Sequence, residues 1–468
     1  MNQDNGGIIG KLNTPTTTVA SGVWTLQDQF EAQTSSIWPL AFPQITFTNS
    51  VRMDGDQSDD SLSRSISGVS TTKFSLSFWT KYAAPQGIGS EGPILFSSEN
   101  NSSDYIIFQL NTSNQIDFSF QGTQNRRITN RVFRDPSAFY HFLVVIDTTE
   151  STASDRLKIY VNGSQETSFA TSTTNVSQSA NISPIDETLN YSIGRYNGQS
   201  SDFCYDGYFS EFIAVYGQAL TPSSFGVFNT VSNIWEPRGY AGTYGNNGFR
   251  LDFANSSALG NDVSGNDNDF TVNNLTSIDQ STDTCSNNFA TANPLIGNAN
   301  VEYSDGNLNT YHTYSGQWRS TISTIGASSG KWYAEYKISA VGTEVSVGIC
   351  DVTTITQTSA NDFIGEFTDS VGYVNSGSIY KANSVAQGSL TTYTANDIIG
   401  IAMDLDNNTI QFYKNGSTIG TTTSLTANKT YAFGTAGYGD ARILWNIGSP
   451  SFSISSGNAD ANGFGNFE

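Results

Sequence analysis

The sequence has few charged residues, few cysteines and no long apolar run, and each shortage excludes a class of protein. Charged residues make up 13% of its 468 residues, about half of the ~25% usual in globular proteins. Three widely spaced cysteines, Cys204, Cys285 and Cys350, predict buried or partly buried thiols, and neither a disulfide framework nor a metal site. The sequence contains no run of about 18 apolar residues, the length that spans a membrane. No secretory signal is visible before the first expected strands.

Positive charge is also scarce. The 21 Lys and Arg residues face 42 Asp and Glu residues, which gives a net charge of −21 and a pI of about 4.3. Such a surface repels phosphate backbones and anionic lipids. The composition therefore predicts a protein that neither binds nucleic acid nor inserts into a membrane.

The residues that catalysis needs are few. Of only two histidines, His141 lies in an apolar stretch and is predicted to be a core residue, while His312 lies between tyrosines and is predicted to be a loop residue or a ligand stacker. Glycosidases on concanavalin-like sandwiches carry their acids as Glu-x-Asp-x-x-Glu, which is absent here; Glu335 has no carboxylate two or four residues away. The sequence predicts no enzymatic activity.

The sequence does contain the residue types and patterns that are typical of β-strands and turns. It is rich in Ser, Thr, Asn and Gly, with 43 glycines, and short alternating apolar stretches recur along it. Two of them end in Tyr-x-Asn-Gly, in "DRLKIYVNGSQETSF" (155–169) and in "DIIGIAMDLDNNTIQFYKNG" (397–416). Asn-Gly is the strongest short hairpin signal because both residues tolerate positive φ. We predict an all-β chain with two antiparallel, jelly-roll-like β-sandwich domains in tandem.

Five segments are expected along the chain. The first, 1–40, has apolar residues at helical spacing and is too small to form a core, so it is predicted to anchor or oligomerise the protein through Trp24, Leu26, Phe30 and Trp38. The others are a first sandwich, a Gly/Asn/Asp-rich connector, a second sandwich and a C-terminal extension, over 41–235, 236–298, 299–450 and 451–468.

Each expected sandwich resembles a known family. "FSLSFWTK", "YHFLVVIDTT", "LKIYVNG" and "SIGRYNGQSSDFCYDGYFSEFIAVYGQALTPSSF" resemble the concanavalin-like, laminin-G-type fold over about 74–228. "GKWYAEYKIS", "VSVGICD", "SVGYVNSGSIYKAN", "DIIGIAMDLDNNTIQFYKNG" and "YAFGTAGYGDARILWNIG" resemble the SPRY (B30.2-like) domain. Each motif alone is weak evidence for its family, whereas the motifs together in this order are specific evidence.

The whole arrangement is similar to fibre and appendage proteins of tailed bacteriophages, in "GKLNTPTTTVASGVWTLQDQFEAQTSSIWP", 240–275 and "STDTCSNNFATANPL". This resemblance implies a structural virion protein, assembled in the host cytoplasm and exposed on the particle. It implies attachment to other virion proteins through the N-terminal segment, a homotrimer or other homo-oligomer, and contact with host-surface polysaccharide. Open alternatives are a purely architectural capsid, neck or tail decoration, a polysaccharide-degrading spike, and a bacterial surface adhesin, against which the missing secretion signal argues.

Two aromatic segments are candidates for glycan binding, because aromatic rings stack on sugar faces while Asn and Asp bond hydroxyls. The alternative is that these aromatic residues cap the edges of the sandwiches. The candidate residues are Tyr196, Asn197, Asp202, Tyr205, Tyr303, Tyr311, Tyr314 and Trp318.

Two acidic segments are candidates for Ca²⁺, which prefers clustered carboxylate and amide oxygens. Neither fits the twelve-residue calcium loop, and the alternative is a solvated acidic turn. The candidate ligands are Asp54, Asp56, Asp59, Asp262, Asp267 and Asp269.

Overall fold

The computed structural model describes most of the chain from residue 47 onward. The described ranges are 47–55, 60–66, 71–83, 92–101, 104–182, 189–196, 204–230, 232–296, 300–313, 316–355, 362–455, 457–460 and 465–468. The predicted N-terminal helix and its anchoring residues Trp24, Leu26, Phe30 and Trp38 lie outside these ranges. In the part that is described, no helix has the length and apolar character to cross a bilayer.

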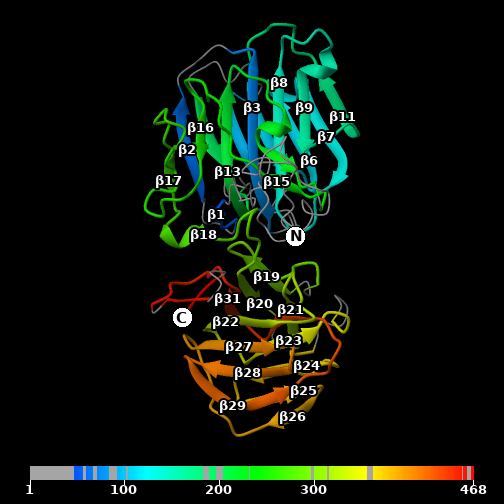
Figure 1. The fold of residues 1–468 in the computed structure, drawn as a ribbon, viewed down its shortest axis with the longest axis vertical. Helices are drawn as coiled ribbons and strands as arrows, with labels where there is room; N and C mark the ends of the chain where they lie inside the picture. The colour runs from blue at the N-terminus through cyan, green and yellow to red at the C-terminus, as the bar shows by residue number, and fades with distance from the viewer. Residues whose placement is uncertain are drawn as a thin grey trace, which may run out of the picture. The chain divides into compact units, whose positions relative to one another are not determined.

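The chain divides into two units, and residues 223–240 belong to the smaller one. There, β14 (Gly226–Phe228) pairs with β15 (Trp235–Pro237) in an antiparallel hairpin. Phe228 packs edge-on against Trp235 with ring centroids 4.9 Å apart. The larger unit comprises Phe47–Pro222 and Ala241–Glu468 and holds both sandwiches (Figure 1).

The first sandwich consists of two eight-stranded antiparallel sheets. One sheet runs β10 (Ser164–Gln165), β9 (Leu157–Val161), β8 (Tyr140–Asp147), β3 (Lys73–Tyr82), β13 (Gly207–Tyr216), β1 (Ser50–Met53) and β18 (Gln280–Ser281), with β16 (Phe249–Leu251) also on β13. The other runs β11 (Phe169–Thr174), β7 (Asn125–Val132), β6 (Gln115–Phe120), β5 (Asp104–Leu110), β4 (Ile94–Asn101), β12 (Leu189–Ile193), β2 (Ser61–Ile66) and β17 (Thr271–Asn273).

Phenylalanine dominates the core between these sheets. Phe78 of β3 stacks on Phe212 of β13 at 4.7 Å and meets Phe108 of β5 at 5.2 Å. Alternation along β5 points Ile106, Phe108 and Leu110 inward, as expected for a strand with one buried face. Short 3₁₀ turns connect some strands, at η1 (Gly122–Gln124), η2 (Ala153–Arg156), η4 (Pro222–Ser224) and η5 (Ser277–Asp279).

The segment 236–298, predicted to be a connector, is largely part of the first sandwich. Its strands extend both sheets, β16 and β18 in one and β17 in the other. Phe249, Leu251 and Phe270 are buried in the first core. Glu211, in a β13 bulge with φ of 51°, makes two 2.8 Å bonds to Arg250 of β16. The Gly/Asn/Asp-rich composition concealed β17 and β18, because each is only two or three residues long.

The second sandwich also pairs two antiparallel sheets (Figure 1). The first runs β19 (Val301–Ser304), β20 (Asn309–His312), β31 (Ala441–Asn446), β22 (Lys331–Ala340), β27 (Ile398–Asp404), β28 (Thr409–Lys414) and β29 (Ser417–Ser424). The second runs β21 (Trp318–Ile322), β30 (Tyr431–Tyr438), β23 (Glu344–Asp351), β24 (Ser370–Val374), β25 (Ser378–Lys381) and β26 (Ser384–Gln387). The all-β prediction of antiparallel sandwiches is confirmed.

Both Asn-Gly hairpins form as predicted. Asn162-Gly163 joins β9 to β10 with φ of 46° and 77°, and Asn415-Gly416 joins β28 to β29 with 47° and 74°. Beyond β10, the chain crosses to the other sheet, where β11 pairs with β7. The second strand of the first hairpin is therefore only two residues long, and β11 begins at Phe169 in the other sheet.

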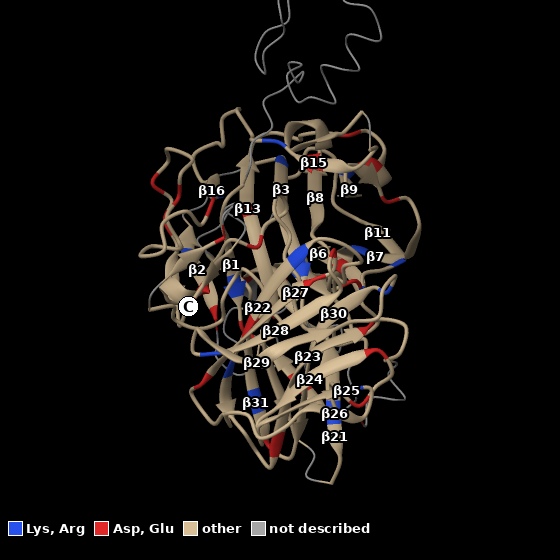
Figure 2. Ribbon diagram, turned by 60° about the horizontal axis from the view of Figure 1, so that its bottom comes forward, with Lys and Arg blue, Asp and Glu red and all other residues tan. Residues whose placement is uncertain are grey.

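Charged residues are sparse on the strands of both sandwiches, as the ribbon colours in Figure 2 show. The three cysteines are free thiols, with Cys204 and Cys350 buried and Cys285 partly buried, which confirms the sequence-based prediction. Stability therefore depends on the apolar cores and on the few ion pairs that are buried.

Both histidines are fully buried, which confirms the prediction for His141 and corrects that for His312, a residue of β20 and not of a loop. Burial penalises the imidazolium ion and lowers the pKa of His141 to about 3 and that of His312 to about 4. In the unfolded chain both titrate near ~6.5. As the pH falls below that value, the unfolded chain takes up protons that the folded chain cannot, so stability falls.

We therefore expect the free energy of unfolding to decrease by about 2 kcal/mol per histidine between pH 6.5 and 4.5. His141→Gln and His312→Gln should each flatten this decrease. Urea unfolding at several pH values measures the slope. Equal slopes in the wild-type chain and in both variants would contradict the assignment of the acid sensitivity to these side chains.

Candidate functional site

The turn between β19 and β20, which we call the joint turn (Asp305–Asn307), connects the two sandwiches. Its three residues have φ of 56°, 64° and 62°. The N–H of Gly306 donates to Asp206 at 2.9 Å, and its carbonyl oxygen accepts the hydroxyl of Tyr208 at 3.0 Å. A Cβ at Gly306 would lie 2.5 Å from that hydroxyl oxygen. Glycine is required here both by the positive φ and by this close approach.

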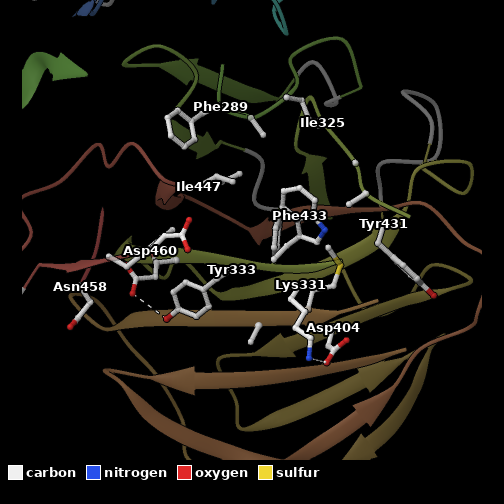
Figure 3. Close-up of a pocket in the computed structure, with 18 of the residues that line it drawn as sticks. Phe289, Ile325, Lys331, Tyr333, Asp404, Tyr431, Phe433, Ile447, Asn458 and Asp460 are labelled. Carbon is white, nitrogen blue, oxygen red and sulfur yellow. Dashed lines mark hydrogen bonds and ion pairs between the residues drawn. The ribbon is translucent and has the colours of Figure 1, made fainter. Parts of the chain in front are cut away.

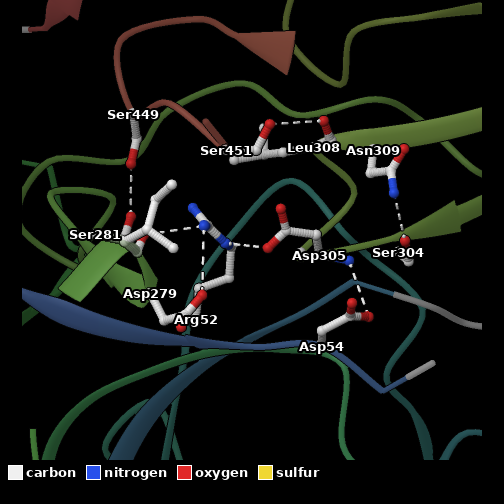
Figure 4. Close-up of polar contacts among 12 residues, drawn as sticks. Arg52, Asp54, Asp279, Ser281, Ser304, Asp305, Leu308, Asn309, Ser449 and Ser451 are labelled. Carbon is white, nitrogen blue, oxygen red and sulfur yellow. Dashed lines mark hydrogen bonds and ion pairs between the residues drawn. The ribbon is translucent and has the colours of Figure 1, made fainter. Parts of the chain in front are cut away.

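Arg52 of β1 is buried at the same place, with a side chain 1% exposed. Its guanidinium pairs with Asp305 of the joint turn and donates to the carbonyl oxygens of Pro450 and Ile278 at 3.1 and 3.0 Å (Figure 4). Ser281 and Ser449 share a hydroxyl–hydroxyl bond of 2.7 Å. Arg52 of the first sandwich thus binds three separate segments, at Asp305, Pro450 and Ile278.

Lys81 of β3 forms a second buried ion pair, with Asp283. Both side chains are 1% exposed. Burial lowers the pKa of the Lys81 ammonium and raises that of the Asp283 carboxyl. Lys81 also donates to Asn288 Oδ1 and to the carbonyl oxygen of Phe289, each at 3.0 Å, and Asp283 accepts the N–H of Phe289 at 3.1 Å. The pair therefore fixes the position of Asn288 and Phe289.

A groove of about 1040 Å³ opens beside this segment, against β22 and β27 of the second sandwich. We call it the joint groove (Figure 3). Trp332 and Ile325, which line it, are 51% and 42% exposed. Its aromatic and apolar lining consists of Phe289, Ile325, Trp332, Tyr333, Met403, Tyr431, Phe433, Ile447 and Phe467.

The polar side chains on the floor of the groove come from alternate residues of β22. Tyr333 donates its hydroxyl to Glu335 Oε1 at 3.1 Å, and Lys331 pairs with Asp404 of β27 at 2.8 Å (Figure 3). Burial raises the pKa of Glu335, whereas the hydrogen bond from Lys331 lowers the pKa of Asp404 to about 2. Gly400 leaves room for the Tyr333 ring, since a Cβ there would lie 2.2 Å from the tyrosine oxygen.

The C-terminal extension forms part of the groove wall. Its strands β32 (Asn458–Ala459) and β33 (Asn466–Phe467) pair antiparallel. Phe467 meets Tyr333 edge-on at 5.0 Å, and the N–H of Glu468 donates to Glu335 Oε2 at 3.0 Å. The extension thus brings Asp460 and Glu468 to a groove whose floor belongs to distant strands.

This arrangement suits binding of a ligand with apolar faces and polar edges, such as a saccharide. It does not suit acid–base cleavage by Glu335 and Asp404. The register pairs Lys331 with Asp404 and Glu335 with Gly400, so the two acids lie four residues apart along the strands. At roughly 3.3 Å per residue that is about 13 Å, more than the ~9.5 Å maximum between the carboxyl groups of inverting glycosidases.

None of the described residues among those predicted to bind glycans lines the joint groove. Tyr205 is wrong as a solvent-facing candidate because it is fully buried, with its hydroxyl bonded to the carbonyl oxygen of Lys81. Tyr196 is half-buried, and Asn197, Asp202 and Tyr314 lie outside the described residues.

The other three candidates lie in strands. Tyr303 of β19 packs against the second core. Tyr311 of β20 stacks under Arg442 at 4.4 Å, and Trp318 of β21 packs against Phe363 at 5.1 Å. These contacts place the rings at the sandwich edges.

The candidate calcium ligands that the structure describes use their oxygens within the fold. Asp262 accepts the N–H groups of Arg250, Ser264 and Asn268, and Asp269 accepts the N–H of Asp262, all at 2.8–2.9 Å. Asp54 accepts the N–H of Asp305 at 3.2 Å, and Asp267 is exposed. Asp56 and Asp59 lie outside the described ranges. No group of three or more potential metal ligands occurs among the described residues, and calcium binding stays a prediction.

A smaller groove of about 370 Å³ lies on the first sandwich. Its main charged group, Asp117, is 3% exposed and pairs with Arg126 through both oxygens at 2.8 and 2.5 Å. Tyr105 is its only aromatic lining residue among those described. With one ring and a neutralised acid, this groove is a weaker candidate than the joint groove.

Two parts of the chain match known families. Residues 55–224 match the Concanavalin A-like lectin/glucanases superfamily, and residues 331–441 match the SPRY domain. The predicted domain content is thus confirmed, and it indicates a carbohydrate- or protein-binding protein. The chain matches no curated protein.

Similar solved structures cover about a third of the chain each. The SPRY domain of human HERC1 is 18% identical, with a TM-score of 0.27, over 33% of this chain and 96% of that one. A heptameric SAP-like pentraxin from Limulus polyphemus is 13% identical, with a TM-score of 0.28, over 37% of this chain and 78% of that one.

Proposed function

We propose that this chain is a non-enzymatic structural protein of a tailed-phage particle that attaches to host-surface polysaccharide through the joint groove. The observation that carries the binding role is the groove itself, with an exposed Trp332 at 51% and Tyr333, Phe289 and Phe467 beside polar side chains. Rings of this kind stack on the C–H faces of sugars while polar groups select hydroxyl positions.

The virion role rests on the resemblance of 10–39, 240–275 and 281–295 to phage appendage proteins. The N-terminal segment would join other virion proteins in the host cytoplasm, and a homotrimer or other homo-oligomer would multiply weak contacts with the host surface. The buried ion pair of Arg52 with Asp305 supports this role because it joins the first sandwich to the second for presentation.

Electron microscopy of particles that carry a labelled copy of this chain tests the virion role. We expect the label at an external appendage, and we expect deletion of 1–40 to leave a folded protein that no longer joins particles. Incorporation of the truncated chain would contradict the anchoring role.

Three further results would replace the proposal. Label on the shell together with fragile particles when the chain is absent, and no glycan binding, would make it a decoration protein. Release of reducing sugar from host capsule would make it a degrading spike. Equal binding of the chain to every host polysaccharide would mean that the chain does not select an attachment ligand.

A further inference from the structure

Four charged groups that line the joint groove have partners within the fold. Lys331 pairs with Asp404 at 2.8 Å. Glu335 is 2% exposed and accepts the N–H of Glu468 at 3.0 Å. The carboxylate of Glu468 in turn accepts the N–H of Ser455 at 2.5 Å. Because these groups are engaged within the protein, a charged ligand would gain little from them and would lose its own hydration.

The surfaces that stay open in the groove are apolar. Ile325 and Trp332 are 42% and 51% exposed, and Phe289, Ile447 and Phe467 are half-buried in its lining (Figure 3). The volume of about 1040 Å³ is at the upper end of the ~300–1,000 Å³ typical of ligand pockets. The groove therefore has room for several sugar residues together with their substituents.

The two isoleucines add a contact that aromatic rings alone do not give. An isoleucine side chain neither donates nor accepts a hydrogen bond, so a sugar hydroxyl placed against Ile325 or Ile447 would lose water without gaining a partner. A methyl group in the same place removes apolar surface from water on both molecules. The walls of the groove thus favour a sugar with an apolar substituent.

We propose that the joint groove selects uncharged saccharides that carry methyl groups, over saccharides with a hydroxyl or a carboxylate at the same position. This inference rests on the proposed glycan-binding function and names the chemical class of its ligand. The sugar ring stacks on an aromatic ring of the groove, and the methyl group lies against Ile325 or Ile447. Such a methyl group belongs either to C6 of a 6-deoxyhexose or to an acetyl group.

Three sugars that differ only at C6 test the proposal, in ligand-observed NMR titrations of the full chain. D-fucose carries a methyl group there, D-galactose a hydroxymethyl group and D-galacturonate a carboxylate. We expect D-fucose to bind about fourfold more tightly than D-galactose, the gain from burying one methyl group. D-galacturonate should bind about tenfold more weakly than D-galactose, because its charge loses hydration without gaining a partner. The preference for D-fucose should persist in ~1 M NaCl, since salt screens charges and does not weaken apolar burial.

A second pair of sugars separates the two sources of the methyl group. N-acetylglucosamine carries an acetyl group where glucose has a hydroxyl. A preference for N-acetylglucosamine alone assigns the methyl group to an acetyl substituent, and a preference for D-fucose alone assigns it to a 6-deoxyhexose. Equal binding within both pairs, or tighter binding of D-galactose and glucose, overturns the proposal.

Variants assign the preference to the groove. Ile325→Ser changes an exposed position and should reduce the preference at least in part, and Ile325→Ser/Ile447→Thr should reduce it to less than about twofold. The matched control is Val385→Ser, at a residue of β26 that is 56% exposed and outside the groove lining, and it should leave the preference unchanged. Circular dichroism checks that the variants are folded. An unchanged preference in the folded groove variants would overturn the assignment.

Binding of host polysaccharide, measured in parallel, separates the failure of this inference from that of the proposed function. Polysaccharide binding without a preference for D-fucose or N-acetylglucosamine overturns methyl selection and leaves glycan binding intact. Absence of binding by the polysaccharide and by every sugar overturns both the inference and the proposed attachment role of the groove.

Discussion

Replacing Asp283 by alanine is expected to lower the free energy of unfolding by about 3–5 kcal/mol. The change leaves the ammonium of Lys81, whose side chain is 1% exposed, without its counter-ion, and a buried uncompensated charge is among the costliest single defects. Phe289 also loses the acceptor of its N–H. Denaturant unfolding followed by tryptophan fluorescence measures the change.

A charge-free replacement provides the control. The double variant Lys81→Met/Asp283→Leu should recover most of the lost stability, because an apolar pair of similar size removes the desolvation penalty. Asp155→Asn should change the free energy of unfolding by less than about 0.5 kcal/mol. If Asp283→Ala changed the free energy of unfolding as little as Asp155→Asn does, that result would contradict the role given to the buried pair.

Replacing Trp332 by alanine is expected to weaken glycan binding about 30-fold, or roughly 2 kcal/mol. The ring lines the joint groove and is 51% exposed, so its loss removes a stacking surface with little effect on the core. Trp332→Phe should retain most of the affinity. Surface plasmon resonance on an immobilised host polysaccharide gives the dissociation constants.

The matched control for Trp332 is Tyr311, an aromatic residue that the sequence had suggested as a glycan contact. It stacks under Arg442 at the sandwich edge and is absent from the groove lining. Tyr311→Ala should leave the affinity within about twofold of wild type. Loss of binding in Tyr311→Ala and not in Trp332→Ala would move the site to the edge of the sandwich.

The fold could be predicted where local chemistry decides it. The two Asn-Gly turns require positive φ at both residues, and these hairpins form with φ of 46–77°. Alternating apolar residues also identified strands such as β3 and β27. The strands β17 and β18 were missed because at two or three residues they have too little alternation to detect, and their pairing partners lie far away in the chain.

The candidate site could not be predicted, because it is assembled from segments whose proximity only the tertiary fold creates. Phe289 is held by Lys81 and Asp283, Tyr333 lies on β22, and Phe467 comes from the C-terminal extension. The one signal in the sequence was Trp332 in "GKWYAEYKIS". It lies near the end of its strand, where a large aromatic side chain is not enclosed by the apolar core. The aromatic segments that looked more exposed, around Tyr205 and Tyr303, pack into the sandwiches instead.

The most direct test of the central claim, that the joint builds the binding groove, is a crystal structure of the chain with a bound oligosaccharide. The account predicts sugar density in the joint groove, over the rings of Tyr333 and Phe467. Sugar density in the smaller groove at Tyr105 and Asp117, with the joint groove empty, would contradict it.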